Sequence, residues 1–539
     1  MGFETLDWII IALYFAMLFV IAIWVIRQKQ DTSSDYFLAG RHVGWFIIGA
    51  SILASNIGSE HIVGLAGTAA KTDMVMGHYE LHSWCVLLLG WVFVPFYMRS
   101  MVFTMPEFLE LRYSPTARWF LSLISLISYV LTKVSVTVYA GAVVFQVLMG
   151  IDFWTGALIV VILTGVYTIL GGLRAVVYTE SLQAIVLIAG SVTVTIMGLV
   201  RIGGWGNLLE IAGSQHFNMF LPADHPEFPW TGMLFAPPII GIWYWCTDQC
   251  IVQRTLAARN ETQARRGTIF AAYLKLLPIF IFMIPGITAY ALAKSGKLDL
   301  PEADQAFPVM VKALLPAGFR GLVAGGLLAA LMSSLAAVFN SCSTLFTMDI
   351  YKKLKPEASE KNLVFVGRIA TGVVVISGIL WIPLMKNISG ELYHYLQSVQ
   401  AYIAPPIASV FLLGLFWKRI NSKGALTALI GGFIVGMTRL TAELFKSSLS
   451  GFPYTFATIN FLHFAIFLFL GCIAAMVIVS LLTREPSYEK IQGLTYETTV
   501  SADREKSRAS WTRFDVVNSV IIIAIIALVL IYFSPINFG

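Results

Sequence analysis

The sequence predicts an all-α polytopic membrane protein with about 14 transmembrane helices. Of its 539 residues, 58% are hydrophobic and only 12% are charged, whereas soluble domains carry roughly 25% charged residues. A bilayer core of about 30 Å needs about 20 apolar residues per helix. The stretches that reach or approach this length are 6–27, 44–69, 77–97, 118–149, 152–172, 176–200, 231–247, 267–294, 320–348, 362–386, 391–417, 424–444, 455–482 and 513–534.

The first stretch and the loop charges predict the topology. Stretch 6–27 is too long for a secretory signal and lacks a cleavage-site flank, so we expect a retained helix. If the N-terminus is outside, the inner loops hold most of the Lys and Arg, including Arg254, Arg265, Lys352 and Arg419. Cytoplasmic loops collect such residues. We therefore expect both termini on the extracellular or periplasmic side of the plasma (cell inner) membrane. Charges spread over short loops argue against a nucleic-acid partner.

Two of the apolar segments are interrupted. The segment 44–69 contains "SILASNIGSEHIVGLAG", which places serines, Asn56, His61 and three glycines at bilayer depth. The segment 231–247 contains Pro237, Pro238 and Gly241. Proline removes a backbone donor, and lipid cannot satisfy the freed groups. These are the second and seventh helices, and discontinuous helices at matching places in two halves are typical of an inverted-repeat transporter with a site at mid-membrane.

This pattern predicts one transporter domain over residues 1–539. Its core repeats would be helices 2–6, about 44–200, and helices 7–11, about 231–417. The polar segment 483–512 has the composition of a cytoplasmic linker. The five cysteines lie in or beside apolar segments and are interpreted as small buried hydrophobes. The peripheral helices would be 6–27, 424–444, 455–482 and 513–534.

An interrupted helix frees carbonyls that can hold Na⁺. The carbonyls of Ala54 and Ile57 flank the expected break at Gly58. The segment "GGLLAALMSSLAAVFNS" could supply the hydroxyls of Ser333 and Ser334 from another helix. On spacing alone, close packing of small residues and serines bonded to their own backbone is an open alternative.

Several polar side chains lie within or near apolar spans, and each has two interpretations. Lys275 costs about 2.5–3.5 kcal/mol at bilayer centre, so it should face a cavity or a counter-charge; a snorkelling or structurally paired Lys is the alternative. Glu80 could be a solvated interfacial residue, and Gln397 could bond between helices. Tyr244 and Trp245 could stack on a ligand or form an interfacial belt.

Together, Asn56, His61, Glu80, Lys275 and Gln397 supply mixed donors and acceptors with few formal charges. That composition suits a neutral, polyhydroxylated ligand. A carboxylate substrate would be expected to attract an uncompensated Lys or Arg, whereas Lys275 has Glu80 and Glu60 as possible partners.

Longer motifs carry a family resemblance. They are "ASNIGSEHIVGLAGT", "TMPEFLELRY", "GGLRAVVYTESLQ", "WYWCTDQCIVQRTLAA", "LMSSLAAVFNSCSTLFTMDIYKK" and "IAPPIASVFLLGLFWKR". Through these motifs the chain resembles the sodium/solute symporter family, particularly the sodium/glucose cotransporters of animals and the bacterial sodium/galactose transporter, from about residue 6 to 485. This resemblance implies a five-plus-five inverted-repeat (LeuT-like) core and Na⁺-coupled symport of a hexose such as glucose or galactose, rather than enzyme activity.

The resemblance also implies roles for single residues. Tyr244 matches an inner-gate tyrosine, and Asp248 sits where relatives place Asp or Asn near the site. The implied Na⁺ ligands are the carbonyls of Ala54, Ile57 and Ala330 and the hydroxyls of Ser333 and Ser334. The implied sugar contacts are Asn56, His61, Glu80, Lys275, Trp245 and Gln397. The implied outer gate is Leu65, Tyr79 and Tyr393.

The sequence departs from the family pattern at several positions. Gly241 replaces a Thr or Asn, which removes one polar sugar contact, and His394 replaces an Asp or Gln. Relatives that move two Na⁺ use an Asp and hydroxyl residues where this chain has Glu180, Ala336 and Ala337. One Na⁺ per sugar is therefore expected.

Other functions have weaker support. The nearest alternative is a symporter of the same family for inositol or a small organic solute. A channel would need a continuous pore, against which the paired interrupted helices argue. An intramembrane enzyme is disfavoured because the sequence has no HExxH, GxSxG or phosphate-loop motif.

Overall fold

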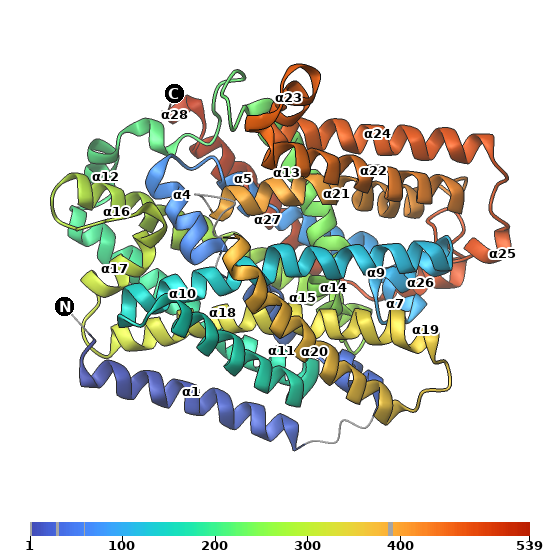
Figure 1. The fold of residues 1–539 in the computed structure, drawn as a ribbon, viewed down its shortest axis with the longest axis horizontal. Coiled ribbons are helices and arrows are strands. Elements are labelled where there is room, and N and C mark those ends of the chain that lie inside the picture. Colours follow the sequence, from blue (N-terminus) through green and yellow to red (C-terminus); the bar gives the residue numbers. More distant parts are fainter. Residues whose placement is uncertain (1–2, 28–31, 59, 386–391, 539) are drawn as a thin grey trace.

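The computed structural model describes residues 3–27, 32–58, 60–385 and 392–538. Every regular element in this part of the chain is a helix, apart from one isolated bridge between Val43 and Ala258. Long helices lie side by side along the longest axis of the molecule (Figure 1). The all-α prediction is confirmed.

The main helices follow the expected stretches closely. Short π-helical turns are built into several of them, at Glu60–Leu65, Leu89–Phe93, Val130–Val134, Ile279–Met283 and Leu345–Tyr351. In chain order the α-helices are α1 (Thr5–Ile26), α2 (Ser33–Leu38), α3 (Trp45–Asn56), α4 (Ala66–Lys71), α5 (Gly77–Glu80), α6 (Ser83–Leu88), α7 (Val94–Ser100), α8 (Met105–Arg112), α9 (Pro115–Tyr129), α10 (Ser135–Met149), α11 (Phe153–Ile202), α12 (Trp205–Ala212), α13 (Trp230–Cys246), α14 (Gln249–Leu256), α15 (Glu261–Leu274), α16 (Ile284–Lys294), α17 (Ala306–Leu314), α18 (Phe319–Thr344), α19 (Lys352–Leu354), α20 (Glu360–Met385), α21 (Leu392–Phe416), α22 (Ser422–Leu444), α23 (Gly451–Thr458), α24 (Phe461–Leu482), α25 (Tyr488–Ile491), α26 (Ser501–Ala509), α27 (Arg513–Tyr532) and α28 (Pro535–Phe538).

The number of membrane spans is lower than the expected fourteen. Within the described residues, eleven helical spans are long and apolar enough to cross a bilayer, or twelve if α3 and the helix after it form one broken span. The other two expected segments are short: one holds the apolar helix Phe153–Val166, and α13 has only 17 residues. The count of about 14 is therefore not confirmed.

Two boundaries differ from the expected stretches for local reasons. The 50-residue α11 contains both 152–172 and 176–200, with non-helical backbone at Gly172 (φ 55°, ψ −161°). A Cβ at Gly172 would lie 2.6 Å from the Tyr36 carbonyl oxygen, so the turn needs glycine. The expected helix 455–482 begins only at Phe461, because the Asn460 side chain caps it by accepting from the Leu462 and His463 amides.

The first interrupted helix is confirmed. The α3 helix ends at Asn56, Ile57 adopts extended backbone (φ −75°, ψ 98°), and the chain then bends by 60° into the helix that runs to Lys71. Glu60 begins the π-helical turn after the bend, and Ser59 lies outside the described residues. The Ala54 carbonyl thus lies in the last turn before the break.

The second interruption lies at a different place from the prolines. The α13 helix continues through Pro237, Pro238 and Gly241 and ends at Cys246. The backbone leaves helical geometry at Thr247 (φ −136°), and α14 starts behind Asp248, whose side chain accepts from the Cys250 amide at 2.9 Å. The N-cap aspartate, rather than the proline pair, defines this break.

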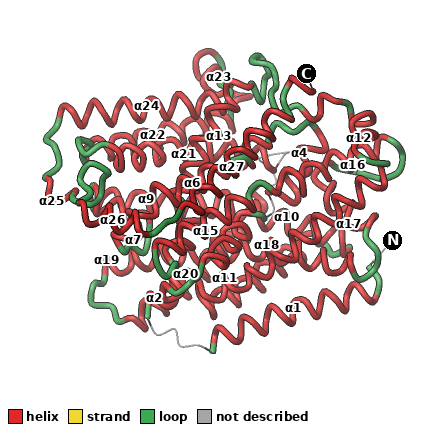
Figure 2. Tube along the Cα trace, turned by 180° about the vertical axis from the view of Figure 1, so that it is seen from behind, coloured by secondary structure: helices red, strands yellow, loops and turns green. Residues whose placement is uncertain are grey.

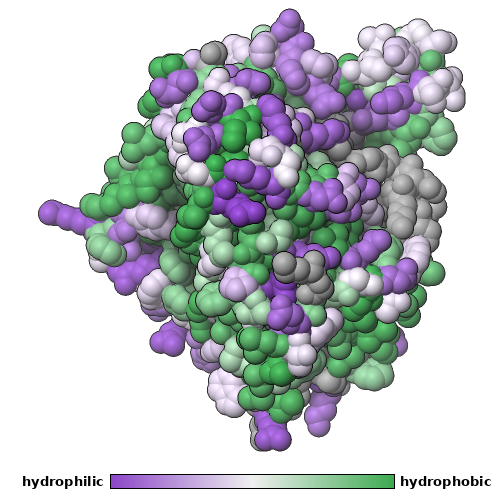
Figure 3. Space-filling model, turned by 90° about the vertical axis from the view of Figure 1, so that its left-hand side faces the viewer, coloured by the Kyte–Doolittle hydropathy of each residue, from purple (hydrophilic) through white to green (hydrophobic). Residues whose placement is uncertain are grey.

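Both termini lie toward the same end of the molecule, near α12, α16 and α17, whereas α19, α25 and α26 lie toward the opposite end (Figures 1 and 2). Seen from the first of these ends, hydrophilic residues gather over the face and hydrophobic residues lie along much of its margins (Figure 3). An even number of crossings gives this placement of the termini.

The segment 483–512 is folded onto the helices, which its linker-like composition did not predict. The Tyr496 ring stacks on Phe416 (ring centroids 5.1 Å apart) and meets Phe96 edge-on at 4.8 Å. Its hydroxyl donates to the Val92 carbonyl at 3.1 Å. On α15, Arg265 donates to Ser510 of the same segment. The segment therefore connects the ends of several transmembrane helices.

Candidate transport site

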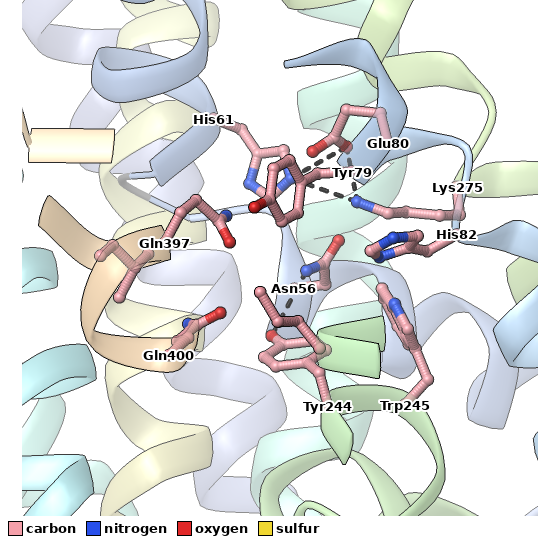
Figure 4. A pocket seen from close by; sticks show the side chains of 12 residues that line it. Asn56, His61, Tyr79, Glu80, His82, Tyr244, Trp245, Lys275, Gln397 and Gln400 are labelled. Carbon is pink, nitrogen blue, oxygen red and sulfur yellow. Dashed lines mark hydrogen bonds and ion pairs between the residues drawn. The ribbon is translucent and has the colours of Figure 1, made fainter. Parts of the chain in front are cut away.

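A small cavity of about 40 Å³ lies where the interrupted helices meet. Ordinary small-molecule sites have roughly 300–1,000 Å³, so binding a solute requires this cavity to widen. Figure 4 shows Gln397 and Gln400 of α21 on one side, with Lys275 and His82 opposite them. The lining residues are Asn56, His61, Tyr79, Glu80, His82, Ile240, Tyr244, Trp245, Lys275, Leu396, Gln397 and Gln400.

Lys275 is neutralised by Glu80 at the cavity wall. Its ammonium lies 2.5 Å from the Glu80 carboxylate, and both side chains are almost fully buried. His61 Nε2 lies 3.2 Å from the same carboxylate oxygen and 3.5 Å from the ammonium. The pair removes the cost of an isolated charge at this depth. The expected counter-charge of Lys275 is therefore Glu80; the side chain of Glu60 is outside the described part.

The backbone places Lys275 in the cavity by ending a helix there. Pro278 has no amide hydrogen, so it cannot donate to the Leu274 carbonyl four residues earlier. The α15 helix consequently ends at Leu274, with Lys275 as its C-cap residue. Helical backbone resumes at Leu277, just before the π-helical turn Ile279–Met283. The lysine thus lies at an interruption within the span that runs from Glu261 to Lys294.

Aromatic and amide groups close another side of the cavity. Asn56, the last residue of α3, donates from Nδ2 to the Tyr244 hydroxyl at 3.3 Å. The Lys275 ammonium lies 5.4 Å from the centroid of the Trp245 ring, within the range of a cation–π contact. The two interrupted helices therefore meet through these side chains.

Several buried polar atoms of the lining have no protein partner. Among the described residues, Asn56 Oδ1, His61 Nδ1, His82 Nε2 and Gln397 Oε1 are buried and accept or donate no hydrogen bond. An unpaired buried polar atom costs about 1–3 kcal/mol. A ligand rich in hydroxyl groups, or ordered water, would satisfy them.

A second cluster joins α18 to the break after α3. The Ser333 and Ser334 hydroxyls both point to the Ala54 carbonyl, at 3.4 and 3.5 Å. All three residues are buried. Ala330 lies one turn earlier on α18, and Ile57 lies at the break itself. These hydroxyl and carbonyl oxygens are the ligand type that a hard cation prefers.

An ion pair below Tyr244 was not anticipated. The Lys133 ammonium lies 3.1 Å from Asp248 Oδ1, 4.5 Å from the Tyr244 ring centroid and 5.0 Å from that of Tyr129. Asp248 is thus a partner of Lys133 and the cap of α14 rather than a wall of the cavity. The pair anchors the second break next to Tyr244.

Glu180 is fully buried but is already paired. Its carboxylate accepts from Arg254 at 2.9 Å, from Ser55 at 3.2 Å and from Ser51. Ala336 and Ala337 are buried without side-chain oxygens. The carboxylate is therefore engaged by a guanidinium in this structure.

Most of the expected substrate residues converge on the cavity, including all six implied sugar contacts and Tyr244 and Tyr79 from the gates. Leu65 is fully buried and does not line it. The side chains of Tyr393 and His394 lie outside the described residues.

Two lining residues were missed from the sequence. Gln400 was missed, although its spacing of three from Gln397 on a helix places both on one face. His82 was missed because it lies two residues after Glu80, and this spacing would place the two side chains on different faces of a continuous helix. The helix is interrupted between them, so both reach the cavity.

The sodium:solute symporter family model matches residues 36–432. The chain belongs to the sodium:solute symporter family. It is therefore a secondary transporter rather than an enzyme, and Na⁺ is its coupling ion. It is a multi-pass membrane protein.

The symporter is similar to several characterised cotransporters. It is 38% identical to sodium/glucose cotransporter 1 of Oryctolagus cuniculus (88% of this chain, 78% of the relative). It is 39% identical to the sodium/mannose cotransporter SLC5A10 of Bos taurus (98% and 97%) and 38% identical to sodium/myo-inositol cotransporter 2 of Homo sapiens (92% and 79%).

A solved structure shows the same fold. The substrate-bound, outward-open Na⁺-coupled sialic acid symporter matches with a TM-score of 0.77 at 22% identity, over 90% of this chain and 99% of that one. The nucleobase-cation symporter Mhp1 matches with a TM-score of 0.53 at 16% identity, over 87% and 99%. The symporter therefore has the five-plus-five fold of Na⁺-coupled transporters.

Proposed function

We propose that this symporter couples the influx of one Na⁺ to the uptake of a neutral polyhydroxylated solute, a hexose such as glucose or galactose. The observation that carries the proposal is the composition of the cavity. Its only described Lys or Arg lining side chain, Lys275, is neutralised by Glu80, while unpaired amide and imidazole atoms face the space. Such a wall suits hydroxyl groups better than a carboxylate.

The proposed sugar contacts come from five segments of the chain. Asn56 and His61 flank the first break, Glu80 and Lys275 form the charged pair, Trp245 offers a ring face, and Gln397 lies opposite. Tyr244 would close the cavity toward the cytoplasm, and Leu65, Tyr79 and Tyr393 toward the outside. Alternating access would open these sides in turn.

The proposed Na⁺ site uses the carbonyls of Ala54, Ile57 and Ala330 with the hydroxyls of Ser333 and Ser334. Its support is the approach of both hydroxyls to the Ala54 carbonyl, which links α18 to the broken helix. Because Asn56 lies two residues after Ala54, Na⁺ and sugar would stabilise the same arrangement of this break. That shared segment would couple the two ligands.

The proposed location is the plasma (cell inner) membrane, with both termini on the outer side. This orientation is supported by Lys352, Lys353 and Lys355, which lie in or directly after α19, at the end opposite the termini. The two repeats proposed for the core are about 44–200 and 231–417.

The test is uptake into proteoliposomes with and without an inward Na⁺ gradient. Labelled glucose, galactose, mannose, myo-inositol and a carboxylate sugar such as sialic acid would be compared at equal concentration. We expect Na⁺-dependent uptake of a neutral hexose and none of the carboxylate sugar. Uptake of myo-inositol alone would select the second candidate, which the inositol cotransporter among the relatives supports. Uptake of the carboxylate would contradict the proposal.

A further inference from the structure

We propose that His82 is a direct substrate contact and that Gly241 makes room for it, so that these two residues set which hydroxyl pattern the symporter accepts. The inference rests on the proposed function, because it concerns the same cavity. The inference adds a pair of residues, His82 and Gly241, that determine substrate specificity, although Gly241 itself has no side chain.

The position of His82 follows from a break in the chain. The α5 helix ends at Glu80 and α6 begins at Ser83, so His82 lies between them as the residue before α6. Its carbonyl accepts from the Cys85 amide at 2.8 Å, whereas its side chain makes no capping hydrogen bond. The backbone therefore begins the helix, and the ring is available for the cavity.

The His82 ring lies at the cavity wall, and its Nε2 atom lacks a hydrogen-bond partner among the described residues. His82 is 5% exposed, and the Tyr79 ring lies edge-on to it at 5.7 Å. Figure 4 shows the imidazole next to Lys275 and facing the space beside Asn56. Within the described part of the chain, Nε2 has no hydrogen-bond partner. A buried imidazole nitrogen next to a polar cavity is completed by a ligand hydroxyl, which can donate or accept.

Gly241 accounts for the place of this ring. A Cβ at residue 241 would lie 2.9 Å from His82 Nδ1, 3.0 Å from His82 Cε1 and 2.9 Å from Cys85 Sγ. A Cβ does not come this close to another side chain, so any residue larger than glycine at position 241 would displace the imidazole. The helix is regular at Gly241, and no unusual backbone angle requires glycine there. The absent side chain thus provides the space that the imidazole occupies.

The two residues therefore act as one unit. A polar side chain at 241 and an imidazole at 82 are mutually exclusive in this geometry, so the polar group that α13 lacks is replaced by one from the break before α6. The hydrogen-bonding group therefore lies at a different place in the cavity wall, and a different hydroxyl of the substrate is recognised.

The decisive experiment pairs protein variants with monodeoxy analogues of the transported solute. Inhibition constants for Na⁺-dependent uptake in proteoliposomes would be measured for the parent solute and for each analogue lacking one hydroxyl. For the wild type, an analogue that lacks a contacted hydroxyl should bind about tenfold more weakly than the parent solute, and we call this ratio the penalty for that hydroxyl. In His82→Phe, the penalty for one hydroxyl should disappear, because that analogue and the parent solute then bind equally well, while the other penalties persist. Ile239→Val, at a buried neighbouring residue that does not line the cavity, is the control and should keep every penalty.

A second pair of variants tests the glycine. Gly241→Ala should reduce the same single penalty as His82→Phe, because the new methyl group displaces the ring. In the His82→Ala background, Gly241→Ala should have little further effect on the pattern, since no ring remains to be displaced. Gly471→Ala, where a Cβ meets nothing within 4 Å, is the matched control.

The outcomes separate the inference from the function on which it rests. A wild type that transports no neutral polyol overturns the proposed function and this inference with it. A wild type that transports one, combined with a His82→Phe variant that keeps all penalties or loses them equally, overturns the inference alone. If His82→Phe does not reach the membrane, His82→Asn serves the same comparison, because its shorter amide leaves Nε2 unreplaced.

Discussion

At the residue scale, Lys275 and Glu80 each neutralise the buried charge of the other. Either charge alone would be buried without a partner in the membrane, and removing one would leave the other uncompensated. Their 2.5 Å contact forms the charged corner of a cavity whose other polar side chains are amides, imidazoles and phenols. In this arrangement a lysine can line a cavity without requiring an anionic ligand.

The first prediction concerns this lysine. Lys275→Ala should lower the apparent sugar affinity by roughly 10- to 150-fold, because it removes a charged donor and leaves the Glu80 carboxylate unpaired. Sugar-concentration dependence of Na⁺-driven uptake measures this. Lys297→Ala, an exposed lysine, should behave like the wild type.

The double variant Lys275→Met/Glu80→Gln separates binding from structure. It removes both charges, so protein levels in the membrane should recover relative to Lys275→Ala, while sugar affinity should not. Wild-type affinity in the double variant would reduce the ion pair to a structural role.

The second prediction concerns Ser334. Ser334→Ala should raise the Na⁺ concentration for half-maximal uptake several-fold, since one oxygen near the Ala54 carbonyl is removed. Sugar affinity should fall mainly at low Na⁺, because coupling between two ligands is reciprocal. Ser343→Ala is the matched control: this buried serine of the same helix donates to the Gly367 carbonyl instead. An unchanged Na⁺ dependence would assign Ser334 to helix packing.

The sequence singled out residues that line the cavity where their chemistry conflicts with lipid. Asn56, His61, Glu80, Lys275 and Gln397 stand out because polar groups in apolar segments need partners. Pairing is harder to foresee: Lys133 and Asp248 are 115 positions apart, and only the fold brings them together. His82 escaped notice for a local reason, since helical spacing assigns it to the wrong face unless the break before it is known.

At the element scale, breaks in helices position the site, and the sequence located them unevenly. The break after α3 coincides with clustered serines and glycines and was predicted. The break after α13 lies at Thr247–Asp248, whereas Pro237 and Pro238 remain helical. Prolines are tolerated within membrane helices when neighbouring groups satisfy the freed carbonyls. A capping aspartate was the better signal, but such a residue is common at any helix start.

The third prediction belongs to the segment 483–512. Tyr496→Ala should lower the midpoint of thermal unfolding in detergent by several degrees, because the ring packs on Phe96 and Phe416 and its hydroxyl donates to the Val92 carbonyl. Tyr488→Ala in the same segment, at a side chain that is 58% exposed, is the control and should have little effect. Equal midpoints for both variants would restore the interpretation of this segment as a linker.

At the scale of the whole molecule, composition sufficed for the class but not for the count. Low charge content and long apolar stretches predicted a polytopic helical protein. The number of spans depends on merged or short helices. The α11 helix runs through non-helical backbone at Gly172, and α13 ends at Cys246, just before the Asp248 cap of α14. Both termini nevertheless lie toward one end, as an even number of crossings requires (Figure 1).

The energetics of transport depend on how many Na⁺ ions accompany each solute. The acidic residue of a possible second site, Glu180, is engaged by Arg254, Ser51 and Ser55. Ala336 and Ala337 offer no side-chain oxygen, and a hard cation needs several. A carboxylate whose charge is already compensated by a guanidinium is a weak attractor for a further cation.

The fourth prediction is therefore a ratio of one Na⁺ per sugar. One charge moving through 100 mV yields about 2.3 kcal/mol, and a tenfold Na⁺ gradient adds about 1.4 kcal/mol. The sum of about 3.7 kcal/mol limits sugar accumulation to roughly 500-fold, whereas a second ion would square that limit. Reversal potentials in proteoliposomes at fixed sugar and Na⁺ gradients give the ratio directly. In Glu180→Gln the ratio should stay at one, because the carboxylate pairs with Arg254 rather than with the transported ion. A wild-type ratio of two that falls to one in Glu180→Gln would instead show that this carboxylate leaves Arg254 during the cycle and binds a second Na⁺.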